Sequence, residues 1–266
     1  MTPTDGNALH AIPRRPRRRH SGREAFSPTA GYAASPDGVY ALAAAGPQGP
    51  RDRAIRIVNF LVASLALILA LPLLILIAIA IKLDSRGPVF YRQLRIGLDR
   101  RAVLGDESGN GLRTADLGGQ PFVIYKFRTM HLDAEARTGP VWAARRDERT
   151  TRVGRVLRRY RLDEIPQFLN VLRGEMSVVG PRPERPSFVS HLRREFLDYC
   201  LRQRVRPGIT GWAQVNQPSD QSLDDVRQKL RYDLEYLNRR SLAFDLRIML
   251  KTLPVMLEGE PTDHAP

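Results

Sequence analysis

The longest run of hydrophobic residues in the sequence extends from Val58 to Ile81 and contains no charged residue. A helix over this segment is about 36 Å long, which is enough to cross the hydrocarbon core of a bilayer. The run starts far from the N-terminus and lacks a cleavage-site pattern, so a signal peptide is not indicated. We therefore predict a membrane helix at residues 51–84.

Two features of this segment bear on its topology. Pro72 removes a backbone hydrogen bond past the middle of the run and bends the helix. Arginines and lysines flank the run on both sides, at positions 51, 53 and 56 and at 82, 86, 92 and 95. Because basic flanks are normally cytoplasmic, a re-entrant helix broken at Pro72 keeps both on one side, whereas a kinked spanning helix leaves one outside. The charge pattern slightly favours re-entry and leaves the spanning alternative open.

Residues 121–130 alternate in the manner of a β-strand. A period of two places four side chains on one face: Phe122, Ile124, Lys126 and Arg128. The two cations therefore project together, toward either a ligand or the solvent.

Two sets of apolar residues then recur with helical spacing. They are Val153, Val156, Leu157 and Tyr160, followed by Ile165, Phe168, Leu169 and Leu172, with Gly174 as a stop signal. The adjacent carboxylates Asp163 and Glu164 lie at the join between the two helices. Aspartate is a favoured N-cap and Pro166 suits a first turn, so we place the pair at the N-terminus of the second helix. Capping explains one carboxylate but not both.

Arginines crowd the same join, at positions 155, 158, 159 and 161. A helix N-terminus with clustered guanidinium groups binds anions, most naturally phosphate. Carboxylates in such a site would repel phosphate unless Mg²⁺ intervened or one of them attacked the phosphorus to form an acyl phosphate. Further arginines stand beside proline and glycine turns, where phosphate contacts are often built: Arg182, Arg185, Arg204 and Arg206.

Composition narrows the choice of partners. The net charge of +14 indicates a polyanion, which could be nucleic acid, an anionic membrane surface or a phosphorylated substrate. No stretch interleaves aromatic and basic residues as a single-strand binder would, which disfavours nucleic acid. Cys200 is the only cysteine, which favours a reducing cytoplasmic setting, and no zinc, Walker or dinucleotide motif is present. Residues 1–50, rich in Pro, Gly, Ala and Arg, are predicted to form a disordered basic tail.

Four stretches carry a resemblance to a known family: YKFRTM (125–130), RLDEIPQFLNVLRGEMSVVGPRPERP (161–186), RVRPGITGWAQVN (204–216) and YDLEYLNRRSLAFDLRIMLKT (232–252). From about Ala54 to Leu257 the chain resembles the compact form of the bacterial sugar transferases, which are polyprenyl-phosphate sugar-1-phosphate transferases, or monotopic phosphoglycosyl transferases. The resemblance implies transfer of a sugar 1-phosphate from a nucleotide sugar, usually UDP-linked, to undecaprenyl phosphate at the cytoplasmic face of the inner membrane. It also implies a re-entrant membrane helix and interfacial helices around the active site.

The resemblance also implies roles for individual residues. Asp163 would be the nucleophile that attacks the β-phosphate and releases UMP, and Glu164 would help it to hold Mg²⁺. The implied phosphate-binding cations are Lys126, Arg128, Arg158, Arg182 and Arg206. The chain departs from the family in two places, because Leu71 replaces the serine that often precedes the break at Pro72, and residues 99–119 lengthen a turn that is usually short.

These observations together predict an α+β, mainly helical monotopic membrane enzyme with a small sheet. We expect one catalytic domain at residues 85–260 that starts a lipid-linked glycan, such as exopolysaccharide or capsule. The alternatives are a membrane pyrophosphohydrolase with water as the acceptor, and a membrane-tethered basic module that binds nucleic acid.

Overall fold

The computed structural model describes residues 50–99, 117–132, 134, 147–218, 220 and 222–258. The expected tail, up to the start of the first helix, and most of the loop at 99–119 lie outside these residues. In chain order the elements are α2 (Pro50–Asp84), β1 (Phe90–Ile96), β2 (Pro121–Phe127), α4 (Arg152–Arg159), η1 (Leu162–Gln167), α5 (Phe168–Arg173), β3 (Ser177–Val179), α6 (Pro186–Glu195), η2 (Leu197–Arg204), β4 (Gly208–Thr210), α7 (Trp212–Asn216), α8 (Leu223–Arg239) and α9 (Leu242–Glu258). The predicted mainly helical α+β fold is confirmed, with two small sheets of two strands each in the described part of the chain.

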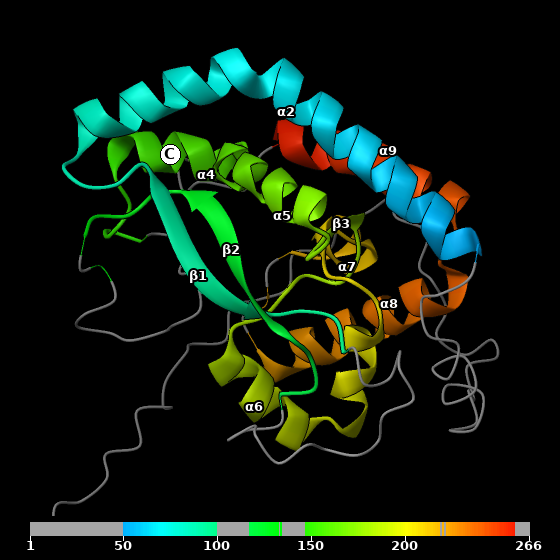
Figure 1. The fold of residues 1–266 in the computed structure, drawn as a ribbon. Coiled ribbons are helices and arrows are strands. Elements are labelled where there is room, and N and C mark those ends of the chain that lie inside the picture. Colours follow the sequence, from blue (N-terminus) through cyan, green and yellow to red (C-terminus); the bar gives the residue numbers. More distant parts are fainter. Residues whose placement is uncertain are drawn as a thin grey trace, which may run out of the picture.

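Helix α2 continues without interruption through Pro72 and is 35 residues long. The expected break is therefore a bend, and Figure 1 shows the helix arching over the rest of the molecule with both ends lying against it. Within the described residues it is the one helix that is long and apolar enough to cross a membrane. Only 11% of its most apolar window is buried, so most of these hydrophobic residues are exposed or half-buried.

Polar side chains fix the first half of α2 to the rest of the molecule. Arg56 donates hydrogen bonds to the carbonyl of Val171 at 2.5 Å and to that of Leu172 at 2.9 Å, near the C-terminal end of α5. The buried Asn59 accepts a hydrogen bond from the backbone N–H of Val178, in β3, at 2.7 Å. Arg56 thus adds a donor to two of the last carbonyls of α5, of which that of Val171 also accepts a hydrogen bond from the N–H of Gly174.

Polar groups also attach the C-terminal end of α2 to the rest of the molecule. Arg128 follows β2, and its guanidinium donates hydrogen bonds to the carbonyls of Ser85 and Arg86, both at 2.7 Å. The carboxylate of Asp84 accepts a hydrogen bond from the N–H of Val153, at the start of α4, at 3.0 Å. Both halves of the apolar helix are therefore attached to the same folded body.

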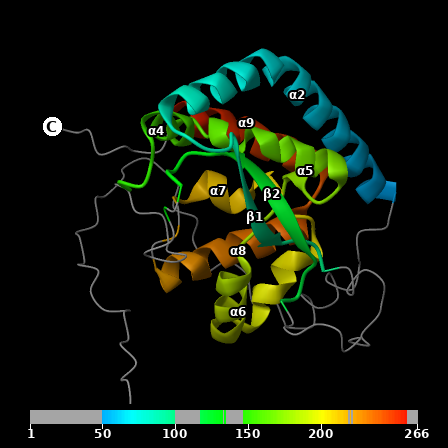
Figure 2. The same cartoon turned by 60° about the vertical axis from the view of Figure 1, so that its left-hand side comes forward.

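The main hydrophobic core lies where α2, α5, α8 and α9 meet the parallel pair β3–β4. Its buried members include Val171, Met176, Val179, Trp212, Tyr236, Phe244 and Ile248. The antiparallel ribbon β1–β2 runs from the end of α2 toward α6, and α9 lies beside α2 in both cartoon views (Figures 1 and 2). Strand β2 packs against η1, the segment that contains Asp163 and Glu164.

Candidate active site

Asp163 and Glu164 lie in η1, a short 3₁₀ helix that leads directly into α5. Arg161 adopts the left-handed conformation with φ 55°, which separates η1 from α4. The prediction that the pair lies at the start of the second helical segment is confirmed. The prediction that this segment ends at Gly174 is also confirmed. The N-cap of η1 is Arg161, and neither η1 nor α5 has a side-chain cap, so the capping explanation for Asp163 is wrong.

Glu164 is buried between two cations. Its Oε1 lies 2.6 Å from Nζ of Lys126, in β2, and 2.5 Å from Nη2 of Arg182. Its Oε2 lies 3.2 Å from Nη1 of Arg182, which completes a two-pronged contact. Although burial opposes ionisation, Arg182 and Lys126 hold the pKa of Glu164 well below its usual range. Glu164 is therefore a fixed negative charge at neutral pH.

Asp163 has the opposite environment. Its side chain is buried, yet its carboxylate accepts no hydrogen bond and forms no ion pair with any residue that the structure describes. Burial raises the pKa of Asp163 to about 6, and the charge of Glu164 adds to this increase. Three cations offset part of it: Lys126, Arg158 and Arg182. At neutral pH Asp163 is thus an ionised carboxylate without a partner, which suits a nucleophile.

Arg158 reaches the site from α4 and is oriented by two hydroxyl groups. Its Nε donates a hydrogen bond to Oγ1 of Thr129 at 3.1 Å, and its Nη1 donates to Oγ1 of Thr150 at 3.4 Å. Sequence reasoning identified Arg158 but missed both threonines. Hydroxyl residues in loops carry no periodic signal, so only the folded chain shows their role.

The remaining two predicted cations lie elsewhere. Arg128 is buried against the end of α2, because β2 stops at Phe127 and the alternation does not continue to residue 128. Arg206 donates a hydrogen bond from Nε to the carbonyl of Gly174 at 3.0 Å, at the far end of α5 from the carboxylate pair. Of the five predicted cations, three therefore gather at the pair and two do not.

The sequence-based expectation places Mg²⁺ at the carboxylate pair. In the described part of the chain, no three His, Cys, Asp or Glu side chains converge as a metal site. The free carboxylate of Asp163 and the remaining acceptor capacity of Glu164 suit Mg²⁺, which typically takes one or two carboxylates together with phosphate oxygens and water. The residues present therefore fit this ion.

A sequence model of the family described as bacterial sugar transferase matches residues 51–259. The chain belongs to this family. The match covers every described element of this sugar transferase except Pro50, the first residue of α2.

Curated proteins of known name are also similar to this sugar transferase. The UDP-N-acetylgalactosamine-undecaprenyl-phosphate N-acetylgalactosaminephosphotransferase of Aeromonas hydrophila is 41% identical over 76% of this chain and 43% of its own length. The UDP-glucose:undecaprenyl-phosphate glucose-1-phosphate transferase of Caulobacter vibrioides is 40% identical over 82% of this chain and 76% of its own length. The protein of the same name from Escherichia coli is 39% identical over 73% of this chain and 38% of its own length. The chain thus spans less than half of the Aeromonas and Escherichia proteins.

Proposed function

We propose that this sugar transferase moves a sugar 1-phosphate from a UDP-sugar to undecaprenyl phosphate, as the first step in building a lipid-linked glycan such as exopolysaccharide or capsule. The observation that carries the proposal is the buried, unpartnered carboxylate of Asp163 next to the fixed charge of Glu164. The names of the relatives supply the substrate classes, and they make UDP-glucose and UDP-N-acetylgalactosamine the first donors to test.

The reaction would proceed in two displacements at one phosphorus atom. An oxygen of Asp163 attacks the β-phosphorus of the UDP-sugar, the bond from that phosphorus to the bridging oxygen breaks, and UMP leaves with the electron pair. This forms an acyl phosphate between Asp163 and the sugar 1-phosphate. A phosphate oxygen of undecaprenyl phosphate then attacks the same phosphorus and releases the Asp163 carboxylate. Both attacking atoms are already anionic oxygens, so neither step requires a general base.

The surrounding charges would lower the barrier to these displacements. Arg158 and Arg182 bring positive charge to a buried site, where its effect on a phosphoryl group is stronger than in water. Asp163 and Glu164 would hold Mg²⁺, which, when bound, offsets the negative charge of the diphosphate. Lys126 fixes Glu164 from the β2 side at 2.6 Å.

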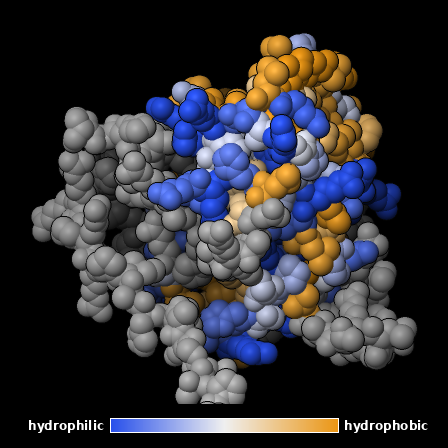
Figure 3. Space-filling model, turned by 90° about the vertical axis from the view of Figure 1, so that its left-hand side faces the viewer, coloured by the Kyte–Doolittle hydropathy of each residue, from blue (hydrophilic) through white to orange (hydrophobic). Residues whose placement is uncertain are grey.

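The exposed hydrophobic surfaces support a membrane-bound arrangement. Helix α9 exposes a row of leucines on one face: Leu242, Leu246, Leu250, Leu253 and Leu257. Figure 3 shows hydrophobic residues gathered over α2 at the top of the molecule. We infer that α2 enters the cytoplasmic leaflet of the inner membrane and that α9 lies at its surface.

The attachments of α2 favour re-entry over spanning. Arg56 and Asn59 bind the body from the first half of the helix, and Arg128 binds the second half from that same body. A helix that crossed the bilayer would have to give up one of these sets of polar bonds. Re-entry retains both and also keeps both basic flanks on the cytoplasmic side.

Cysteine accessibility tests this topology. In a Cys200→Ser background, we expect single cysteines introduced by Arg53→Cys and Arg86→Cys, both at exposed positions, to resist an impermeant maleimide in intact cells. Both should react once the membrane is permeabilised. Reaction of only the first cysteine in intact cells would establish a spanning helix. A Pro72→Leu variant should straighten α2 and shift position 53 toward that outcome.

Turnover with defined substrates tests the proposed function. We expect the purified protein, supplied with Mg²⁺ and undecaprenyl phosphate, to release UMP from at least one UDP-sugar and to form a polyprenyl-diphosphate sugar detectable by mass spectrometry. Free sugar 1-phosphate formed without lipid would instead identify a pyrophosphohydrolase. No UMP release from any donor, with nucleic-acid binding that weakens steeply with salt and does not depend on Asp163, would identify a binding module.

A further inference from the structure

The turn that carries Arg182 is held through its backbone carbonyls. Four successive carbonyls, at residues 181–184, each accept a hydrogen bond from a donor elsewhere in the chain. The donors, in that order, are the N–H of Gly208, Nη2 of Arg202, Nη1 of Arg95 and the N–H of Ile96. Because Pro181 and Pro183 have no N–H, distant elements rather than local hydrogen bonds set the geometry of this turn.

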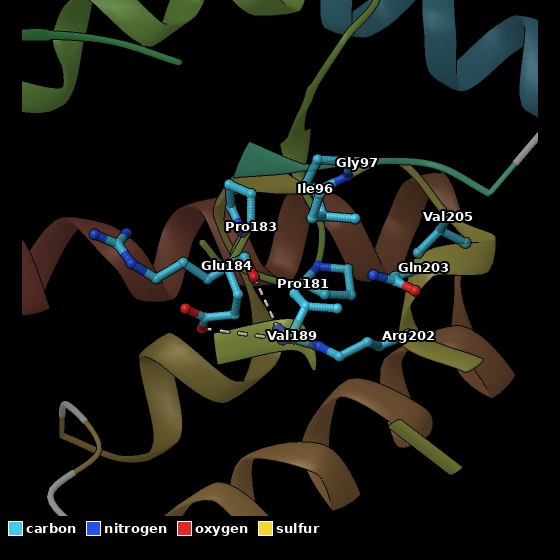
Figure 4. A pocket seen from close by; sticks show the side chains of 11 residues that line it. Ile96, Gly97, Pro181, Pro183, Glu184, Val189, Arg202, Gln203 and Val205 are labelled. Atoms are coloured by element: carbon cyan, nitrogen blue, oxygen red, sulfur yellow. Dashed lines mark hydrogen bonds and ion pairs between the residues drawn. The ribbon is translucent and has the colours of Figure 1, made fainter. Parts of the chain in front are cut away.

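Among these four donors, Arg202 is the one that binds the backbone carbonyl of Arg182. Its Nη2 lies 2.8 Å from the carbonyl oxygen of Arg182, and its side chain is only 4% exposed. The same guanidinium donates a hydrogen bond to the hydroxyl of Tyr199 at 2.7 Å and lies 2.8 Å from the carboxylate of Asp233. Figure 4 shows Arg202 extending beneath the turn toward Glu184, whose carboxylate is 3.9 Å away. These contacts hold both terminal nitrogens of the guanidinium.

The cluster around Arg202 contains equal numbers of positive and negative side chains. Lys229 lies 2.6 Å from Glu184 and 2.7 Å from Asp220, and Asp233 pairs with Arg202. Arg95 supplies the third positive charge, 3.8 Å from Glu184. Burial opposes ionisation of Glu184, yet the surrounding cations lower its pKa to about 2. The cavity beneath the turn, about 20 Å³, has room for about one water molecule. The cluster therefore pairs its charges internally and supports the turn.

We propose that Arg202 is a positioning residue for the transfer reaction: by fixing the backbone of Arg182, it aims the Arg182 guanidinium at Glu164. The proposal rests on the proposed function for its catalytic consequence. A two-pronged bond to a carboxylate depends on direction, so a small shift of the Arg182 backbone would break it. Glu164 would then keep Lys126 as its only ion-pair partner, and its carboxylate would no longer be held in one position next to Asp163.

The decisive variant removes Arg202 without leaving an unpaired charge behind. Arg202→Met together with Asp233→Asn deletes one positive and one negative charge, and leaves the ion pairs of Lys229 in place. Val226→Ala is the matched control, because Val226 is buried in the same apolar cluster as Tyr199 but has an apolar side chain that offers the turn no hydrogen bond or charge. Circular dichroism and thermal unfolding should show that both variants are folded.

We expect the double variant to lower kcat roughly 10- to 100-fold, as losses of supporting contacts around active sites commonly do, while the control stays near wild type. In an Arg182→Met background the same double substitution should change kcat less than about twofold, because there is no longer a guanidinium to aim. A radiolabelled donor makes the slow turnover of that background measurable. An equal loss of kcat in both backgrounds, or an equal loss in the control, would refute the positioning role.

A second measurement does not depend on turnover. Hydrogen–deuterium exchange of the peptide covering residues 161–168 should become faster in the double variant, since η1 loses its link to the clamped turn, and should not change in the control. Unchanged exchange of this peptide in the double variant would overturn the proposal. A wild-type protein that fails to release UMP would refute the proposed function and leave this structural test intact.

Discussion

Asp163→Asn should abolish UMP release, with a loss of roughly 10³-fold or more. The amide has the shape of the carboxylate but cannot form the acyl phosphate with the sugar 1-phosphate. When the wild type is given the UDP-sugar without lipid acceptor, it should release UMP in a burst equal to the amount of enzyme. Its mass should rise by one sugar phosphate, on the peptide that contains Asp163. The variant should show neither the burst nor the adduct.

The same substitution should increase stability at high pH, and this provides its internal control. The pKa of Asp163 is raised to about 6 in the folded protein, so its folded state is destabilised as pH rises from about 4 to 6, and the full penalty remains above 6. At pH 8, Asp163→Asn should therefore unfold a few degrees above the wild type, and near pH 4 the difference should vanish. An inactive variant that is less stable at pH 8 would point to misfolding, and normal turnover would refute the nucleophile.

The sequence predicted those features that depend on neighbouring residues. The helical spacing at residues 153–160 gives α4, and Gly174 ends α5 because it accepts a left-handed conformation that L side chains rarely adopt. The adjacent carboxylates and Lys126 were found in the same way, by local spacing. These patterns depend only on residues close together in the sequence, so they can be recognised without knowing how distant elements pack.

The contacts that individual side chains make with distant parts of the chain could not be predicted in this way. Arg128 and Lys126 are two residues apart and were expected to act together, yet Arg128 binds carbonyls at the end of α2, more than 40 residues earlier in the sequence. The left-handed conformation before η1 falls on Arg161 and is likewise not marked by a glycine. Arg202 and its carbonyl partner are 20 residues apart and share no motif spacing. These contacts depend on how distant elements pack.

Neighbours in the chain, Asp163 and Glu164 have environments that move their pKa values in opposite directions. Burial dominates for Asp163, which has no ion-pair partner, while two cations dominate for Glu164. Paired carboxylates separated in this way usually divide their roles in a reaction. One is left free to react and the other is held as a fixed charge. The second carboxylate should therefore respond to substitution in a way that differs from the first.

Glu164→Gln should lower both activity and stability. Lys126 and Arg182, both partly buried, would remain without their counter-charge, which should reduce the free energy of unfolding at pH 8 by about 1–3 kcal/mol. Loss of the fixed charge should lower kcat roughly 10²-fold or more, because the reacting groups would no longer be held in place. Glu175→Gln is the matched control, since Glu175 accepts a hydrogen bond from Asn170 but does not sit between buried cations, and it should stay near wild type. Thermal unfolding at pH 8 should thus shift downward for Glu164→Gln and upward for Asp163→Asn. A shift of both variants in the same direction would contradict the assignment of opposite roles to the two carboxylates.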